Sequence, residues 1–430
     1  MNGASVSNNG SNISLKRLLA IFAGGNLICL ILRLGGGLLV ARATTPETLG
    51  LFNGLSLVLG YVPFVQLGII NGLNRELPYY IGLNDKQKAY ALASCAQVWA
   101  LIVGSVTGAI LIGVGVWQFS KGRNEIAFGW LIQAWLSFQY IYVQMYLLVT
   151  YRSKGDFSKL TISNVIQSIA TFALIIFVWL YGFYGLCIRA VLVSLVAFYT
   201  MWKWRPLKVR AVWNYESFKH LLKIGAPIFG VSQIYAWWIV LDSTLVLRYK
   251  GIHNLGVYAV AIMAGTAIEV IPAALSQISY PRMAEEYGRT GSLRATTRII
   301  INPVRYLSLV YIPLVLICWY AAPPAIRMLI PKYVESVKAV QWTCASSALL
   351  ALTPINSIFV VIKRLDIYFA AIMAGIGTYV LTVWILYKHD SNLSIFPKSL
   401  IVGRVVFLLI CYSAIKYIGG DNRYEHPVSQ

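Results

Sequence analysis

Long apolar stretches alternate with short polar segments along the whole chain, and this pattern predicts about twelve membrane-spanning helices. Each stretch is close to the ~20 apolar residues that a helix needs to cross a bilayer. The expected spans are residues 18–41, 49–72, 89–117, 127–150, 162–181, 183–202, 222–247, 255–279, 304–322, 337–362, 366–387 and 399–418. The fifth and sixth spans are separated only at Tyr181 to Phe183, which predicts a helical hairpin there. We therefore expect an all-α membrane protein with no large soluble domain.

The composition supports this interpretation. Of 430 residues, 58% are hydrophobic and 12% are charged, whereas a soluble domain carries roughly 25% charged residues. The mean hydropathy is +0.68. The net charge of +21 comes from residues spread over many loops. This distribution argues against nucleic-acid binding, which would need a separate basic domain.

The distribution of Lys and Arg predicts the orientation in the membrane. When alternate loops are assigned to the side of the N-terminus, that side holds 23 of the 36 basic residues, the other side holds ten, and three lie inside spans. Basic loops remain in the cytoplasm, so we expect both termini to be cytoplasmic. The basic surface would also contact anionic membrane lipids.

Cofactor and metal sites are not expected. All six cysteines fall inside predicted spans without a CxxC motif, and the four histidines are scattered in loops or tails. Buried cysteines of this kind are small apolar packing residues. The polar residues 1–14 lack a signal-peptide pattern, so the first apolar stretch is interpreted as a transmembrane helix.

The chain contains a repeat with a period of about 206 residues. The segments Arg42 to Phe52 and Arg248 to Tyr258 keep an arginine, a Leu-Gly pair and an aromatic residue at the same spacing. Six spans separate the copies, so both halves have the same orientation, as in transporters built from parallel repeats; chance similarity between apolar segments is the alternative. The expected organisation is a polar N-terminus (1–14), a six-helix lobe (15–202), a basic linker (203–221), a second six-helix lobe (222–418) and a tail (419–430).

Polar residues inside the spans mark faces that are turned away from lipid. Arg33 is in the middle of the first span, and Asn26 lies seven residues earlier on the same face. The candidate residues of an internal cavity are Asn26, Arg33, Gln133, Tyr140, Gln144, Arg189 and Trp238, with Arg75 at its cytoplasmic mouth and with the acids Asp242 and Glu269.

Each candidate also has a structural alternative. Amides and hydroxyls often form hydrogen bonds between membrane helices. Arg189 and Arg404 lie near the outer ends of their spans, which favours extension of their charged groups to the interface. Asp242 is close to the outer end of its helix and could pair with Arg42 or Arg248. For Arg33 the alternative is a buried ion pair.

The guanidinium of Arg33 suits one class of ligand. It stays protonated when partly desolvated, and its planar fork of donors matches phosphate. A basic, water-filled cavity would attract a diphosphate headgroup and repel simple cations. Hydroxyl, amide and aromatic side chains, including Trp238, would contact attached sugars. A lipid tail could stay in the bilayer.

Several segments in a fixed order together form a recognisable pattern: Ala41 to Phe52, Leu67 to Pro78, Leu221 to Pro227, Asp242, Leu255 to Tyr258, and Tyr280 to Arg282. In these segments the chain resembles the polysaccharide-export flippases of the Wzx-like, polysaccharide-synthase branch of the multidrug/oligosaccharidyl-lipid/polysaccharide exporter superfamily. This resemblance implies two six-helix lobes that form a V around a central cavity in the bacterial cytoplasmic (inner) membrane. It also implies alternating access that moves polyprenyl-diphosphate-linked oligosaccharide, such as an O-antigen or exopolysaccharide precursor, to the outer leaflet.

The resemblance extends to residues and partners. It implies that Arg33 holds the diphosphate and that Arg75 captures the headgroup at the cytoplasmic mouth. A polysaccharide polymerase and glycosyltransferases are the partners it suggests. Coupling to a proton or sodium gradient occurs in the superfamily, and Asp242 or Glu269 would be the candidate coupling residues.

Two other functions remain open at this point. The first is a cation-coupled multidrug exporter of the same fold, which would need acidic residues in its cavity. The second is a membrane-embedded polymerase or glycosyltransferase. We do not expect an enzyme, because the predicted outer loops are short and paired carboxylates, a glycine-rich phosphate loop and a nucleophile motif are not found.

Overall fold

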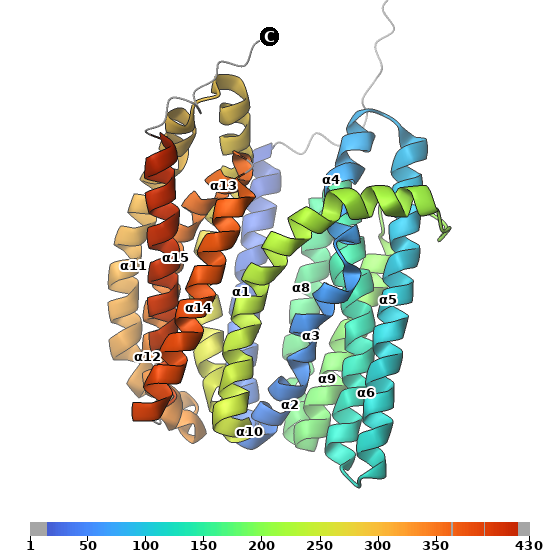
Figure 1. Ribbon diagram of the computed structural model, residues 1–430. Coiled ribbons are helices and arrows are strands. Elements are labelled where there is room, and N and C mark those ends of the chain that lie inside the picture. The colour runs from blue at the N-terminus through green and yellow to red at the C-terminus, as the bar shows by residue number, and fades with distance from the viewer. Residues whose placement is uncertain (1–14, 363, 391, 420–430) are drawn as a thin grey trace, which may run out of the picture.

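The computed structural model describes residues 15–362, 364–390 and 392–419. Every regular element in these ranges is a helix, and the helices form two bundles (Figure 1). The first bundle contains α1 (Leu15–Ala43), α2 (Pro46–Ser56), α3 (Val58–Tyr61), α4 (Ile69–Gly82), α5 (Lys86–Ser120), α6 (Asn124–Gln139), α7 (Leu148–Lys154), α8 (Phe157–Ala173) and α9 (Ile175–Lys203). The second contains α10 (Tyr215–Thr290), α11 (Leu293–Leu329), α12 (Val337–Ala348), α13 (Ser357–Val361), α14 (Leu365–His389) and α15 (Ile395–Gly419).

The predicted spans agree with these helices. Each of the twelve falls on a helical stretch. Within the described ranges, nine helical stretches are long and apolar enough to cross a membrane. One of them, Ser232–Ser276, includes two predicted spans because α10 reverses direction at Gly251. The fold class predicted from the sequence is confirmed, and the protein is a multi-pass membrane protein.

Two glycines make the tightest reversals. Gly182 (φ 53°) lies between the fifth and sixth predicted spans, and Gly251 (φ 79°) lies between the seventh and eighth. Both φ values are in the left-handed region that glycine occupies without steric cost. Across the first reversal, a Cβ on Gly185 would overlap the carbonyl oxygen of Phe177. The predicted hairpin is therefore confirmed, with glycine required for both the turn and the close approach.

The second span is interrupted rather than continuous. A 3-10 helix at Val62–Gln66 is followed by Leu67 and Gly68, both with positive φ (54° and 88°). The side chain of Gln66 accepts a hydrogen bond from the backbone N–H of Ile70 at 2.9 Å, which satisfies a donor that the break would leave free. The break brings the backbone of Gly68 against that of Gly225 at the start of α10.

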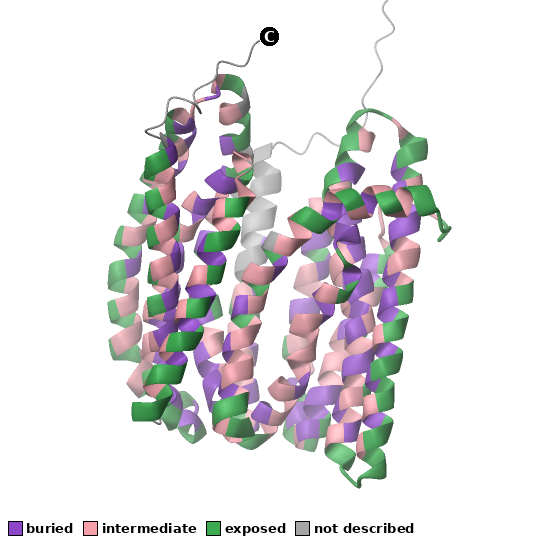
Figure 2. Cartoon of the chain, viewed as in Figure 1, coloured by how far each residue is buried: buried purple, intermediate pink, exposed green. Residues whose placement is uncertain are grey.

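Two large hydrophobic clusters stabilise the bundles. One joins α4, α5 and the fourth span around Leu73, Ile141 and Tyr146. The larger one fills the second bundle around Tyr258 and Tyr379 and continues into α1, α2 and α9 of the first bundle. Figure 2 shows buried residues inside both bundles and exposed residues on the outward faces. α1 begins and α15 ends at the same end of the molecule (Figure 1), as an even number of spans requires.

The bundles contact each other along α10. Its first half (residues 215–250) lies along the second span, where Tyr61 and Thr244 share a hydrogen bond of 2.7 Å. Its second half (residues 252–290) meets α1 where a Cβ on Gly37 would overlap the sulfur of Met263. The contact between the first half of α10 and the second span extends along the molecule. The contact between the second half of α10 and α1 lies near the end at which α2 begins.

Candidate functional site

The second bundle contains a cavity of about 410 Å³ whose walls are mostly apolar but include several polar and charged side chains. Both halves of α10, the tenth span, α14 and α15 contribute to its walls. The residues that give it chemical character are Trp238, Asp242, Tyr258, Glu269, Asn356 and Arg404. Three of the residues predicted from the sequence, Trp238, Asp242 and Glu269, are therefore brought together by the fold.

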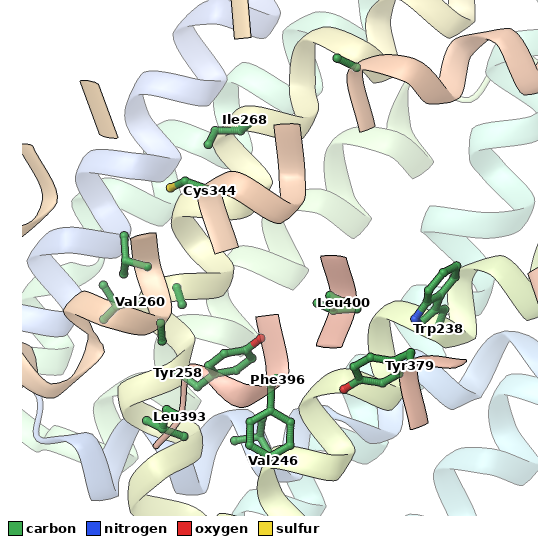
Figure 3. Close-up of a cluster of buried hydrophobic side chains, with 14 of the residues drawn as sticks. Trp238, Val246, Tyr258, Val260, Ile268, Cys344, Tyr379, Leu393, Phe396 and Leu400 are labelled. Carbon is green, nitrogen blue, oxygen red and sulfur yellow. The ribbon is translucent and has the colours of Figure 1, made fainter. Parts of the chain in front are cut away.

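Asp242 is a buried carboxylate with two tyrosine partners. The hydroxyls of Tyr258 and Tyr379 each donate to one of its oxygens at 2.8 Å. Figure 3 shows both tyrosines in the buried cluster of the second bundle, with Tyr379 beside Trp238. The suggested pairing of Asp242 with Arg42 or Arg248 is wrong, because burial inside the bundle requires local donors for the carboxylate.

Glu269 and Arg404 form an ion pair at the cavity wall. Nη2 of Arg404 lies 3.5 Å from Oε1 of Glu269, and Nη1 donates to Ser346 at 3.1 Å. The hydroxyl of Ser347 donates to the same carboxylate oxygen at 3.3 Å. Extension of Arg404 to the outer interface is therefore not observed. The carboxylate of Glu269 and the hydroxyl of Ser346 stabilise the guanidinium inside the bundle instead, and Ser347 stabilises the carboxylate.

Three buried polar side chains at the cavity have atoms without a hydrogen-bond partner among the described residues. These atoms are the indole N–H of Trp238, the hydroxyl of Thr343 and both amide atoms of Asn356. Asn356 ends a 3-10 segment, Leu349–Asn356, that interrupts the tenth span at Pro354. An unsatisfied buried donor or acceptor costs roughly 1–3 kcal/mol, so these groups need a partner that enters the cavity.

Arg33 is exposed and lies on the side of α1 that faces the second bundle. At 100° per residue, it lies within about 40° of Gly37, which packs on Met263. Exposed Ile28 and Ile31 lie on the opposite side of the helix, as expected for contact with lipid. No ion pair of Arg33 is found within the described part of the chain, so a buried pair does not account for it.

The other predicted residues of the first bundle are dispersed. Gln133 is buried and donates to Ser56 at 2.9 Å, as a link between helices. Tyr140 and Gln144 are half-buried in a π-helical segment, Tyr140–Leu147, of the fourth span. Arg189 is half-buried, and its Nε donates to the carbonyl oxygen of Thr171 at 2.8 Å.

Arg75 is exposed in the middle of α4, where its Nε lies 3.9 Å from Glu76. Glu76 is buried and bonds to His220 of α10 at 2.8 Å, which links the two bundles at the end where α1 begins. The prediction for the side chain of Asn26 lies outside the side chains that the structure describes.

Sequence reasoning missed Tyr379, Asn356 and the role of Arg404. Asn356 is adjacent to the polar stripe of Thr353 and Ser357, so a search for intramembrane amides would have found it. Tyr379 carries no such signal, because tyrosines are common in this chain and its partner is 137 residues away.

Comparisons with known proteins agree with the fold and with the predicted resemblance. Residues 142–338 match the family model described as "Polysaccharide biosynthesis protein". No curated protein matched the chain in a sequence search. This match covers slightly less than half of the chain and agrees with the predicted resemblance to a polysaccharide-export family.

Several solved structures of transporters match nearly the whole chain. One is described as an inward-facing conformation of a multidrug resistance MATE family transporter of the MOP superfamily; it has 16% identity and a TM-score of 0.72, over 94% of this chain and 99% of the other. Its outward-facing counterpart has 15% identity and a TM-score of 0.67, over 94% and 96%. A third, from Pyrococcus furiosus, is described by the reverse polarity of its binding pocket, with 16% identity and a TM-score of 0.64, over 94% and 95%.

Proposed function

We propose that this protein is a flippase that moves polyprenyl-diphosphate-linked oligosaccharide across the cytoplasmic membrane by alternating access. Arg33 would bind the diphosphate between the two bundles, and the polyprenyl chain would remain in lipid. The match to a polysaccharide biosynthesis family and the transporter fold support a transport function. The identity of the cargo is our inference from the site.

The observation that carries the proposal is which charged side chains have partners and which do not. Arg33 is exposed toward the second bundle and has no ion pair among the described residues. The acids of the cavity are occupied, because Glu269 pairs with Arg404 and Asp242 accepts two tyrosine hydroxyls. The space between the bundles therefore offers an unneutralised cation, which favours an anionic ligand.

A cation-coupled multidrug exporter is the second candidate. The fold supports it, since related structures are multidrug transporters. A cationic drug would need a carboxylate that faces the space between the bundles, whereas Glu269 is neutralised by Arg404 and Asp242 is buried, with each of its oxygens accepting a tyrosine hydroxyl. The description of the Pyrococcus furiosus transporter links reverse pocket polarity to a different function, and an arginine at the centre of the cleft is consistent with such a change here.

We further propose that the structure represents the state open to the cytoplasm. α1 and the second half of α10 contact each other at Gly37 and Met263, toward the end where α2 begins. The opposite end, where α1 begins, carries the predicted cytoplasmic loops. The higher TM-score to the inward-facing transporter supports this assignment. Asp242 and Glu269 remain the candidates for coupling to a proton or sodium gradient.

The test uses purified full-length protein and three ligands: undecaprenyl diphosphate, undecaprenyl monophosphate and ethidium. We expect preference for the diphosphate lipid, loss of at least tenfold in affinity in Arg33→Ala, and partial recovery in Arg33→Lys, because an ammonium lacks the bidentate fork. Arg327→Ala, at the exposed far end of α11, is the control and should bind normally.

The same variants can be expressed in a strain that lacks its own flippase. Arg33→Ala should abolish surface polysaccharide while the protein still inserts in the membrane. Tight ethidium binding that is unaffected by Arg33→Ala, together with normal surface polysaccharide in that variant, would support the multidrug exporter instead.

A further inference from the structure

We propose that the cavity of the second bundle binds an uncharged sugar ring of the lipid-linked oligosaccharide and thereby determines which glycan is transported. This inference rests on the proposed function, because it places the sugar next to a diphosphate held by Arg33. It adds a separate subsite on the opposite bundle, formed by different residues.

The cavity has the size and the opening that this role needs. Its volume of about 410 Å³ falls within the roughly 300–1,000 Å³ of pockets that hold small ligands. Ile239 on the first half of α10, and Thr266 and Ala273 on its second half, line the cavity and are exposed. One opening is therefore between the two halves of α10, and the exposed Val360 of α13 also lies at the edge of the cavity.

This opening faces the first bundle. Val240, next to Ile239, packs against Gly60 of α3, and Met263, one turn before Thr266, packs against Gly37 of α1. Both halves of α10 thus turn toward the first bundle beside the mouth of the cavity. A ligand between the bundles can enter the cavity without crossing lipid.

Arg33 and the cavity lie at similar depth. α1 and the second half of α10 are antiparallel, because Gly37 contacts Met263 whereas Pro46 contacts Gly256. Arg33 lies four residues from the Gly37 contact, roughly 6 Å along its helix, and Glu269 lies six residues from Met263, roughly 9 Å in the same direction. A diphosphate and its first sugars could therefore contact both sites at once.

The walls provide what a neutral sugar requires. The N–H of Trp238 and the amide of Asn356 are buried without partners, and a sugar hydroxyl can both donate to and accept from such groups. Tyr235, Tyr368 and Phe407 also line the cavity and offer aromatic faces. The 3-10 segment that ends at Asn356 brings this amide to the cavity wall.

The charges of the cavity argue against an acidic sugar. Glu269 is neutralised by Arg404, whereas Asp242 contacts only tyrosine hydroxyls among the described residues. A uronic acid would place another carboxylate close to Asp242 without a free cation in the cavity. Like charges in a poorly solvated site repel strongly.

The experiment measures binding of three lipids to the purified protein: undecaprenyl diphosphate, the same lipid with one N-acetylglucosamine, and the same lipid with one glucuronic acid. We expect the wild type to bind the N-acetylglucosaminyl lipid most tightly. Asn356→Ala and Trp238→Phe should each weaken that binding at least tenfold and leave binding of the sugar-free lipid unchanged. Gln341→Ala is the matched control, since this amide lies on the same span but bonds to the carbonyl oxygen of Trp319.

The outcomes separate this inference from the proposed function. If Asn356→Ala and Trp238→Phe weaken both lipids equally, or neither, the sugar subsite is wrong. If the glucuronyl lipid binds as tightly as the N-acetylglucosaminyl lipid, the preference for an uncharged ring is wrong. If Arg33→Ala leaves binding of the sugar-free lipid unchanged, the proposed function fails on its own. If Asn356→Ala does not fold, Trp238→Phe still tests the sugar subsite, because phenylalanine keeps an aromatic face at this position.

Discussion

Gly50 and Gly256 pack against each other where α2 meets the second half of α10, and they occupy equivalent positions in the two halves of the chain. A Cβ on Gly50 would overlap the carbonyl oxygen of Ile252, and one on Gly256 would overlap the carbonyl oxygen of Pro46. Pro46 and Ile252 are separated by the same 206 residues as the two glycines. The repeat seen in the sequence thus coincides with a reciprocal contact between the bundles.

Substitution of either glycine should open this contact. Gly256→Ala places a methyl group against backbone that cannot move aside, and overpacking of this kind costs about 1–3 kcal/mol. We expect a lower thermal unfolding temperature of the purified variant. We also expect reduced transport, measured as surface polysaccharide in a complemented strain.

Gly113→Ala is the control for this substitution. Gly113 lies in the long helix α5, and a Cβ there would meet nothing within 4 Å. Alanine has the higher helix propensity, so this variant should be neutral or slightly more stable. If Gly256→Ala behaves like Gly113→Ala, the close contact does not hold the bundles together.

A second pair at the same junction predicts that it must open during transport. Nδ1 of His253 lies 2.5 Å from Oε1 of Glu47, again 206 residues away, and its Nε2 lies 3.7 Å from Glu335. In a background without the six native cysteines, Glu47→Cys and His253→Cys should be joined by a short bifunctional thiol reagent. Cross-linking should block transport, because alternating access separates the bundles at this end.

Each single-cysteine variant is the control and should keep its transport after the same treatment. A cross-linked double variant that still transports at the wild-type rate would contradict opening at this junction. A reducible reagent makes the block reversible, which excludes loss of activity through damage to the protein.

The spans and the hairpin could be predicted because their causes are local. About 20 apolar residues define a spanning helix, and the short connection at Gly182 allows only a hairpin. The repeat was visible because both halves carry the same residue types at the same spacing, including Gly50 and Gly256, although the contact between these two glycines was not predicted. Features that depend only on neighbours in sequence, such as the spans and the hairpin, were thus predicted correctly.

The partners of the buried charges could not be predicted in this way. Asp242 could have paired with either nearby arginine, but its partners are Tyr258 and Tyr379, and the second lies on α14. Arg404 is close enough to the helix end to reach the interface, yet Glu269 holds it inside. The partners of Asp242 and Arg404 depend on how helices that are distant in the sequence pack together. A pattern of polar positions along the chain does not specify this packing.

The pair of Glu269 and Arg404 should show strong energetic coupling. Each single substitution, Glu269→Gln or Arg404→Gln, leaves one charge without its partner, and for fully buried pairs this costs about 3–5 kcal/mol. The side chain of Glu269 is 29% exposed, so we expect a smaller loss, on the order of 1–3 kcal/mol. The double variant should lose less than the sum of the two, as a thermal or chemical unfolding cycle would measure. Additive losses would mean that the two charges do not interact.

The last prediction concerns the tyrosines around Asp242. Tyr258→Phe or Tyr379→Phe removes one of two donors from a buried carboxylate, at a cost of about 1–3 kcal/mol for the unsatisfied acceptor. Each variant should therefore unfold at lower temperature, and the double variant should lose more than either. Tyr387→Phe on the same helix as Tyr379 is the control, because that tyrosine is exposed and its hydroxyl makes only a long contact of 3.4 Å. Equal stability of Tyr379→Phe and Tyr387→Phe would show that Asp242 does not depend on these hydroxyls and obtains its stabilisation from water in the cavity.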